Sequence, residues 1–118
     1  MSESKLKILF VCTINRMRSA TAHTIYSDDP TFEVRSAGTD KHANNILSEE
    51  LLYWADTIVV MEKEHRDFIM DNFKEIYQTK RIVCLYIRDL YSYMQPELID
   101  VLKEKFEDVY QRGFIDAD

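Results

Sequence analysis

The sequence predicts a single α/β domain built on a parallel β-sheet. Short apolar runs alternate with amphipathic segments along all 118 residues, and the first run, at residues 8–12, is unbroken. An unbroken apolar run that is too short for a helix is typical of a central strand covered on both faces. Only two glycines and two prolines occur, which leaves little room for flexible linkers. We therefore expect one domain that spans residues 1–118.

The alternation places four strands and four helices. Strands are expected at Lys7 to Cys12, Phe32 to Ser36, Thr57 to Met61 and Arg81 to Ile87. Helices are expected at Ser19 to Tyr26, after an N-cap at Ser48, at Glu62 to Phe73, and from Pro96 to Val109. A loop at residues 88–94 follows the fourth strand, and the acidic tail after Gly113 is expected to fray.

The composition limits the kinds of partner. The formal net charge is −6, which argues against nucleic acid or an anionic membrane as the main partner, because both require a basic surface. No apolar run approaches the roughly 20 residues that a membrane-spanning helix needs. The N-terminus leads directly into a strand, without the features of a signal peptide. We therefore expect a cytoplasmic protein, whose oligomeric state the sequence does not indicate.

Two cysteines and three histidines are the candidates for thiol or metal chemistry. Cys12 and Cys84 are far apart in the sequence, and in a reducing compartment a lone functional cysteine usually acts as a thiolate. Cys84 lies in the middle of an expected strand and is interpreted as a buried structural thiol. His23, His42 and His65 lack the spacing of metal ligands, so neither a metal nor another cofactor is expected.

The residues that indicate a chemical function begin where the first strand ends. Cys12 is followed after five residues by Arg18 and then by Ser19, where a helix is expected to begin. A thiolate at this position meets backbone N–H groups and a helix N-terminus, which stabilise it and also attract an anion. Arg18 can hold two phosphate oxygens at once. The predicted phosphate-binding residues are Thr13, Ile14, Asn15, Arg16, Met17, Arg18 and Ser19.

Three residues of this loop have further expected roles. Asn15 tolerates a left-handed backbone conformation and can brace the loop through its amide. Ser19 can hydrogen-bond the thiolate sulfur and help it to leave in a later step. Arg16 is either a surface charge or a residue that steers the substrate phosphate, and the sequence does not decide between these roles.

The loop after the fourth strand is expected to supply an acid. The carboxyl ends of parallel strands meet at one edge of a sheet, so Asp89 is expected to lie near Cys12. There it can protonate a leaving group and later activate water, which is worth roughly 100- to 10,000-fold in rate. Tyr91 and Tyr93 are predicted to line the substrate cleft, although either can instead cover the core.

These features resemble the low-molecular-weight protein tyrosine phosphatase family, and within it a short bacterial branch of predicted phosphatases. The matching segments are the loop pattern of Cys12, Asn15, Arg18 and Ser19, the second-strand signature Arg35 to Thr39, the third strand Asp56 to Met61, and Asp89-Leu90-Tyr91 on the Asp-Pro-Tyr general-acid motif. The resemblance runs from about Lys7 to about Phe106. It implies a three-layer α/β/α fold with a four-stranded parallel sheet in the order 2-1-3-4, a cysteinyl-phosphate intermediate and no metal.

The chain also departs from this family pattern. Ile14 stands where the family usually has glycine, Met17 where it often has a second cysteine, and Leu90 where the acid motif has proline. The stretch between Gly38 and Ser48 is much shorter than in typical members, in which it forms one wall of the substrate cleft. Phosphotyrosine, another phosphorylated side chain and small phosphate esters therefore all stay open as substrates.

Three functions follow from these residues. The leading prediction is a phosphomonoester hydrolase of the protein tyrosine phosphatase type, which acts on a phosphorylated protein or a small phosphate monoester. In this reading Cys12 is the nucleophile, Arg18 clamps the phosphate and Asp89 is the general acid and base. The second is a catalytically weak module that binds phosphate or phosphoproteins. The third is arsenate reduction on the same scaffold, for which Cys84 is a poor resolving cysteine.

Overall fold

The computed structural model describes residues 5–115 and contains a four-stranded parallel sheet in the order β2-β1-β3-β4. The strands are β1 (Leu6–Cys12), β2 (Phe32–Gly38), β3 (Thr57–Val60) and β4 (Arg81–Cys84). The helices are α1 (Arg18–Tyr26), α2 (Glu49–Trp54), α3 (Lys63–Asn72), α4 (Lys74–Thr79) and α5 (Pro96–Gln111). The strand order and the alternation of strands with helices confirm the predicted fold class.

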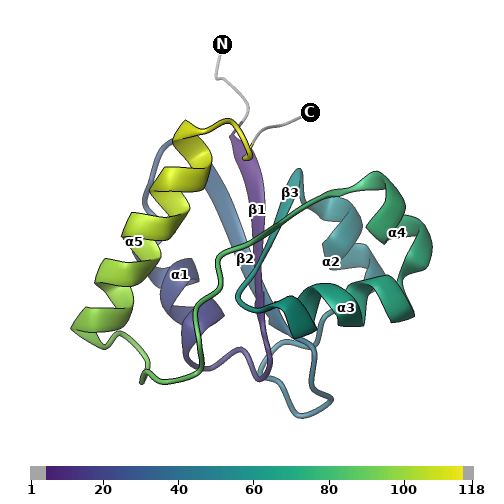
Figure 1. Cartoon of the computed structure of the whole chain (residues 1–118), viewed down its shortest axis with the longest axis horizontal. Coiled ribbons are helices and arrows are strands. Elements are labelled where there is room, and N and C mark those ends of the chain that lie inside the picture. Colours follow the sequence, from purple (N-terminus) through teal and green to yellow (C-terminus); the bar gives the residue numbers. More distant parts are fainter. Residues whose placement is uncertain (1–4, 116–118) are drawn as a thin grey trace.

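The sheet lies between two layers of helices. Figure 1 shows α1 and α5 on one side of the sheet and α2, α3 and α4 on the other. The side chains of β1 alternate between these layers: Ile8, Phe10 and Cys12 join the core under α1 and α5, whereas Leu9 and Val11 join the core under α2, α3 and α4. All five are buried, which explains the unbroken apolar run and confirms the three-layer arrangement.

The two helix starts predicted from capping and first-turn residues are also present in the structure. The backbone N–H of Leu51 donates to Oγ of Ser48 at 3.2 Å, so that Ser48 closes the first turn of α2. Pro96 is the first residue of α5, where its missing N–H removes no helical hydrogen bond. Both starts are therefore set by local chemistry that the sequence displays.

The fourth strand is shorter than predicted. The expected strand from Arg81 to Ile87 ends at Cys84, because Tyr86 has a left-handed backbone conformation with φ of 57°. The N–H of Leu85 still donates to the Val60 carbonyl at 3.0 Å, and the N–H of Ile87 donates to the Met61 carbonyl at 2.8 Å. The segment that leads to Asp89 therefore stays hydrogen-bonded to the end of β3, although β4 itself has ended.

Helix α4 is missing from the sequence prediction. The helix expected to run to Phe73 ends as α3 at Asn72, and Phe73, with φ of −136° and ψ of 57°, separates it from α4. No glycine or proline marks this break in the sequence, and no side chain makes a capping hydrogen bond at the start of α4. Ile69 of α3 and Ile76 of α4 are buried in the same core, so tertiary packing stabilises the second helix.

The prediction that the chain frays after Gly113 is wrong for Ile115. This side chain is 3% exposed and belongs to the core under α1 and α5, whereas Phe114 is exposed. Burial of an aliphatic side chain stabilises the folded state by about 1.5–3 kcal/mol, which holds the end of the chain against the sheet. The remaining acidic tail at residues 116–118 and the N-terminal residues 1–4 lie outside the described residues.

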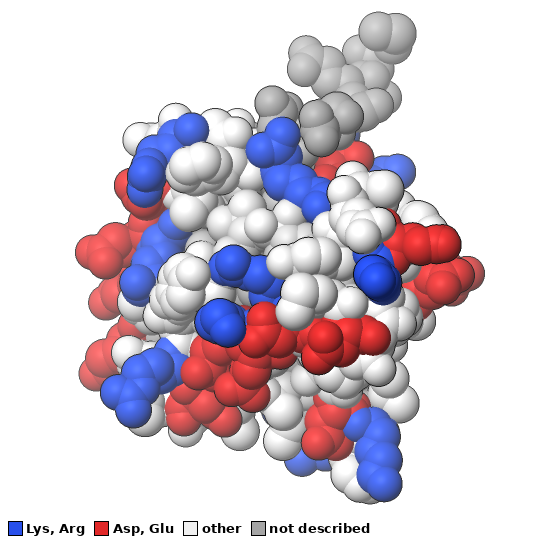
Figure 2. Space-filling model, turned by 45° about the vertical axis from the view of Figure 1, so that its right-hand side comes forward, with Lys and Arg blue, Asp and Glu red and all other residues white. Residues whose placement is uncertain are grey.

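The surface carries charges of both signs. On the face shown in Figure 2, lysine and arginine side chains lie among aspartate and glutamate side chains, and acidic side chains form a continuous band near its lower centre. A positive site for an anion on such a protein has to come from particular residues rather than from the overall charge. Within residues 5–115, no helix has both the length and the apolar character needed to cross a membrane.

Candidate active site

A short segment after β2, residues 39–44, holds the loop that follows β1, and we call it the strap. Four successive loop carbonyls, those of residues 12–15, accept hydrogen bonds from it. The donors are Thr39 N–H to Cys12 O (3.0 Å), Asp40 N–H to Thr13 O (2.9 Å), Asn44 N–H to Ile14 O (3.0 Å) and Asn44 Nδ2 to Asn15 O (3.1 Å). In a trans peptide the C=O and the following N–H point in opposite directions. The N–H groups of residues 13–16 therefore point away from the strap.

These loop N–H groups are available to a ligand. Within the described part of the chain, no backbone N–H of residues 13–17 donates to a protein acceptor. Successive N–H groups on one side of a loop form a concave site that binds anions. The strap thus occupies the carbonyl side of the loop and leaves its donor side open.

Cys12 ends β1 at the base of this loop and is 3% exposed. Its Sγ lies 3.0 Å from Oγ of Ser19, and Nδ2 of Asn15 donates to the same Oγ at 2.8 Å. Because the Ser19 hydroxyl accepts from Asn15, its own proton can be donated to the sulfur. The alternative acceptor, the Ala37 carbonyl, is more distant at 3.5 Å. Asn15 has φ of 61°, the left-handed conformation expected of a residue that braces the loop.

Arg18 has one anchored edge and one free edge. Its side chain is 2% exposed, and its Nη1 donates to Oε1 of Glu62 at 2.5 Å and to the carbonyl of Ile87 at 2.8 Å. Its Nε is buried and has no hydrogen-bond partner among the described residues, since Oδ1 of Asp89 lies 3.8 Å away. An unpartnered buried donor is costly, so this edge of the guanidinium is prepared for an oxyanion.

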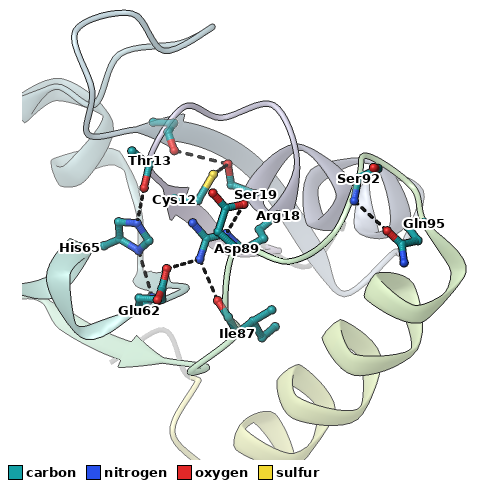
Figure 3. A network of polar contacts seen from close by, with 11 residues as sticks. Cys12, Thr13, Arg18, Ser19, Glu62, His65, Ile87, Asp89, Ser92 and Gln95 are labelled. Atoms are coloured by element: carbon teal, nitrogen blue, oxygen red, sulfur yellow. Dashed lines mark hydrogen bonds and ion pairs between the residues drawn. The ribbon is translucent and has the colours of Figure 1, made fainter.

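Glu62 and His65 connect Arg18 to the loop. The N–H of Glu62 donates to Nδ1 of His65 at 3.0 Å, and Nε2 of His65 lies 3.0 Å from Oγ1 of Thr13. Burial, followed by the charge of Arg18, lowers the pKa of His65 to about 4. The imidazole is therefore neutral at neutral pH, with its proton on Nε2 and directed at Thr13. Figure 3 shows the resulting chain of contacts from Arg18 through Glu62 and His65 to Thr13.

A pocket of about 180 Å³ opens over Cys12. Its lining residues come from the end of β1, the loop that follows it, the first residue of α1 and the segment after β4: Cys12, Thr13, Ile14, Arg16, Met17, Arg18, Asp89 and Tyr91. The volume is below the roughly 300–1,000 Å³ of pockets that enclose drug-sized ligands, so it suits the terminal group of a larger molecule. Figure 3 shows the carboxylate of Asp89 beside the Arg18 guanidinium. The structure thus brings the predicted nucleophile, clamp and acid together.

Tyr93 does not line this pocket, contrary to the prediction. Its hydroxyl lies 2.8 Å from Oγ1 of Thr24, and it borders a separate polar hollow of about 540 Å³. The next residue, Met94, has φ of 59°, and its N–H donates to Oγ1 of Thr21 at 2.9 Å. These contacts hold Tyr93 and Met94 against α1, whereas Tyr91 lines the pocket.

One departure from the expected loop sequence, Ile14, is accommodated by the backbone. Ile14 is not among the described residues with a positive φ, so its side chain adds no backbone strain, and it is 39% exposed. The glycine that the loop does require is Gly38. A Cβ on Gly38 would lie 2.5 Å from the Thr13 carbonyl oxygen and 2.7 Å from Cβ of Ala43. Gly38 therefore permits the close approach of the strap to the loop.

Three further residues of the site, Glu62, His65 and Asn44, were not predicted from the sequence. Glu62 directly follows the third strand as predicted, at the same sheet edge as Cys12 and Asp89, so the strand-end argument was able to find it. His65 is three residues further on, the spacing at which the two side chains cap a helix start reciprocally. No sequence signal indicates Asn44, because its role depends on the path of the strap.

Comparisons with known proteins identify the fold. No family model and no curated protein matches the chain. The arginine phosphatase YwlE from Geobacillus stearothermophilus is similar in structure, with 24% sequence identity and a TM-score of 0.62 over 92% of this chain and 97% of that chain. The tyrosine phosphatase AmsI from Erwinia amylovora has 19% identity and a TM-score of 0.72 over 92% of this chain and 93% of that chain. A low-molecular-weight protein tyrosine phosphatase from Bacillus subtilis has 21% identity and a TM-score of 0.65 over 90% of this chain and 98% of that chain. The chain therefore has the low-molecular-weight protein tyrosine phosphatase fold, as its motifs predict.

Proposed function

We propose that this protein is a cysteine-dependent phosphatase that hydrolyses phosphomonoesters through a phosphorylated Cys12. The observation that carries the proposal is the unpartnered Nε of Arg18, which is buried at the pocket over Cys12. The loop N–H groups beside it also have no acceptor among the described residues. A phosphoryl group supplies the oxygens that satisfy both sets of donors, directly above a sulfur that can attack phosphorus.

In the first step, the thiolate of Cys12 attacks phosphorus and an S–P bond forms while the P–O bond to the leaving group breaks. Asp89 donates its proton to the leaving oxygen, which departs as an alcohol or phenol. Arg18 and the loop N–H groups hold the three equatorial oxygens, on which the transition state carries its charge. The chain of contacts through Glu62 and His65 keeps these donors in place.

In the second step, the carboxylate of Asp89 takes a proton from a water molecule as the water oxygen attacks phosphorus. The S–P bond breaks, inorganic phosphate is released and the Cys12 thiolate is restored. The Ser19 hydroxyl, 3.0 Å from the sulfur, stabilises the returning negative charge. Asp89 ends the cycle protonated, so protons and electrons balance over the two steps.

The favoured substrate is a phosphorylated protein side chain, with phosphotyrosine as the first candidate. Ile14 and Met17 are each 39% exposed at the pocket, and Tyr91 also lines it, so the pocket mouth is partly apolar and aromatic. Such a surface suits an aryl leaving group. The similar structures include both arginine and tyrosine phosphatases, which makes phosphoarginine the competing substrate.

The alternative functions use the same loop differently. A phosphoprotein-binding module would bind through the donors of Arg18 and the loop without turnover. Arsenate reduction requires a second cysteine that can reach Cys12, but Cys84 belongs to the core on the opposite face of the sheet. The geometry therefore favours phosphate ester hydrolysis over arsenate reduction.

Turnover of p-nitrophenyl phosphate by the purified, reduced protein tests the proposal. We expect hydrolysis between about pH 5 and 7, and its loss in Cys12→Ser, because serine is a much weaker nucleophile at this pH. Parallel assays with phosphotyrosine and phosphoarginine peptides then rank the substrates. Binding of a phosphopeptide without any turnover would replace the enzyme with the binding module.

A further inference from the structure

Arg16 is a second arginine at the pocket, in a different state from Arg18. Both line the cavity over Cys12, but Arg18 is buried and its charge is paired with Glu62. Arg16 is exposed at the rim, and the structure records no ion pair for it within the described residues. Its positive charge is therefore uncompensated where a substrate has to enter.

The strap orients the Arg16 side chain. Nε of Arg16 donates to Oδ1 of Asn44 at 3.1 Å. Asn44 is itself fixed, because its N–H bonds the Ile14 carbonyl at 3.0 Å and its Nδ2 bonds the Asn15 carbonyl at 3.1 Å. The two terminal nitrogens of Arg16 have no hydrogen-bond partner among the described residues. A guanidinium held in this way loses less conformational entropy when it binds an anion.

The phosphoryl group does not need Arg16, since the free edge of Arg18 and the loop N–H groups already supply donors for its oxygens. Asp89 is the acidic residue among those that line the pocket, and in the proposed reaction it is protonated when substrate binds. A second anionic group on the substrate, outside the small phosphate pocket, is therefore the ligand that Arg16 is free to receive.

We propose that Arg16 is a specificity-determining residue that selects phosphorylated peptides with an aspartate or glutamate next to the phosphorylated residue. The inference rests on the proposed function, because it assumes that a phosphorylated side chain enters the pocket. In this proposal the strap also has a role: its residue Asn44 orients Arg16 toward the flanking residue of the substrate.

Competition between matched phosphotyrosine peptides tests this inference. One peptide carries glutamate on both sides of phosphotyrosine and the other carries glutamine there, and the ratio of their kcat/KM values is measured. We expect wild-type protein to prefer the glutamate peptide by about two- to five-fold, as for an exposed ion pair. The ratio should fall toward one in Arg16→Gln and, in part, in Asn44→Ala. High salt should reduce the wild-type ratio, because exposed charges are screened.

Arg88→Gln is the matched control, since Arg88 is an exposed arginine close in sequence to Asp89 that does not line the pocket. This variant should keep the wild-type ratio. A preference for the glutamate peptide that survives in Arg16→Gln, or the absence of any preference in wild-type protein, would overturn the inference.

Binding separates this inference from the proposed function. Fluorescence anisotropy with the same two peptides is measured on Cys12→Ser, with and without Arg16→Gln. A glutamate preference that needs Arg16 supports the inference even if wild-type protein shows no turnover, a result that would end only the phosphatase proposal. Equal binding of both peptides by Cys12→Ser, or binding of neither, contradicts the inference.

Discussion

Oε1 of Glu62 lies 2.5 Å from Nη1 of Arg18, and this pairing decides which edge of the guanidinium faces the pocket. Nη1 also donates to the Ile87 carbonyl, so one side of Arg18 is used within the protein. The opposite edge, with its buried and unpartnered Nε, is left for a ligand. In the proposed function, Glu62 thus supports anion binding without touching the anion.

Replacement of Glu62 tests this anchoring. We expect Glu62→Ala to raise the KM for an aryl phosphate and to lower the free energy of unfolding by about 1–3 kcal/mol, because a buried donor of Arg18 loses its partner. Glu62→Gln keeps an acceptor at this position and should have the smaller effect on both quantities. Denaturant unfolding and steady-state kinetics measure them. An alanine variant with wild-type stability and KM would show that Glu62 does not anchor Arg18.

The buried His65 makes stability depend on pH. Its pKa is about 4 in the folded protein and ordinarily 6.5. Below pH 6.5 the unfolded chain therefore binds a proton that the folded protein does not. The contribution of the neutral His65 to the free energy of unfolding is fully present above pH 6.5. It is lost as the pH falls toward 4, and the loss amounts to at most about 3 kcal/mol.

His65→Gln removes this titration and isolates its contribution. Denaturant unfolding of wild-type protein and His65→Gln at about pH 7 and about pH 4.5 gives the pH-dependent change for each. We expect a smaller decrease for the variant, since glutamine has no proton to gain. If both proteins lose the same stability between these pH values, His65 is not neutral in the folded protein.

Gly38 sets the distance between the strap and the loop that follows β1. A methyl group there would meet the Thr13 carbonyl oxygen and Cβ of Ala43, so the loop has to shift. We expect Gly38→Ala to lower kcat/KM for an aryl phosphate at least tenfold, because a misplacement of about 1 Å costs roughly 100-fold. Gly113→Ala is the control, because Gly113 has φ of 83° and open space around it. This variant should lose stability but keep its activity. Equal activity of the two variants would contradict this account.

The pH dependence of turnover tests the role of Asp89. A bell-shaped profile has a basic limb where the general acid loses its proton. In Asp89→Asn this limb should disappear, and kcat for a poor leaving group should fall by roughly 100- to 10,000-fold. Steady-state kinetics across the pH range measures both effects. A basic limb that persists in the variant would move the acid role to another residue.

The parts of the site that the sequence displays are those with local patterns. Cys12, Asn15, Arg18 and Ser19 are close together in the chain, and their spacing alone places them around one loop. Prediction of the position of Asp89 requires one further rule, that the carboxyl ends of parallel strands lie at the same edge of the sheet. The four strands can also be predicted locally. A strand that is buried on both faces of the sheet needs apolar side chains at successive positions, and these form a short apolar run in the sequence.

The parts that the sequence misses depend on tertiary geometry. Helix α4 begins at a break without a glycine or proline, and the packing of Ile76 and Tyr77 against the core supports it. Asn44 acts through the path of the strap, which no residue pattern encodes. Tyr93 lies outside the pocket, where its hydroxyl contacts Thr24 of α1. Each of these features is set by contacts between segments rather than by local propensity.

The central claim is the phosphorylated Cys12, and intact-protein mass spectrometry of an acid-quenched reaction tests it most directly. Asp89→Asn is the protein to use with p-nitrophenyl phosphate, because this leaving group needs little acid assistance whereas hydrolysis of the intermediate still requires a base. We expect one phosphoryl group per chain, located at Cys12 by peptide mapping and missing in Cys12→Ala, whose side chain offers no nucleophile. A product formed without any phosphorylated protein, or with the phosphoryl group on a residue other than Cys12, would contradict the mechanism.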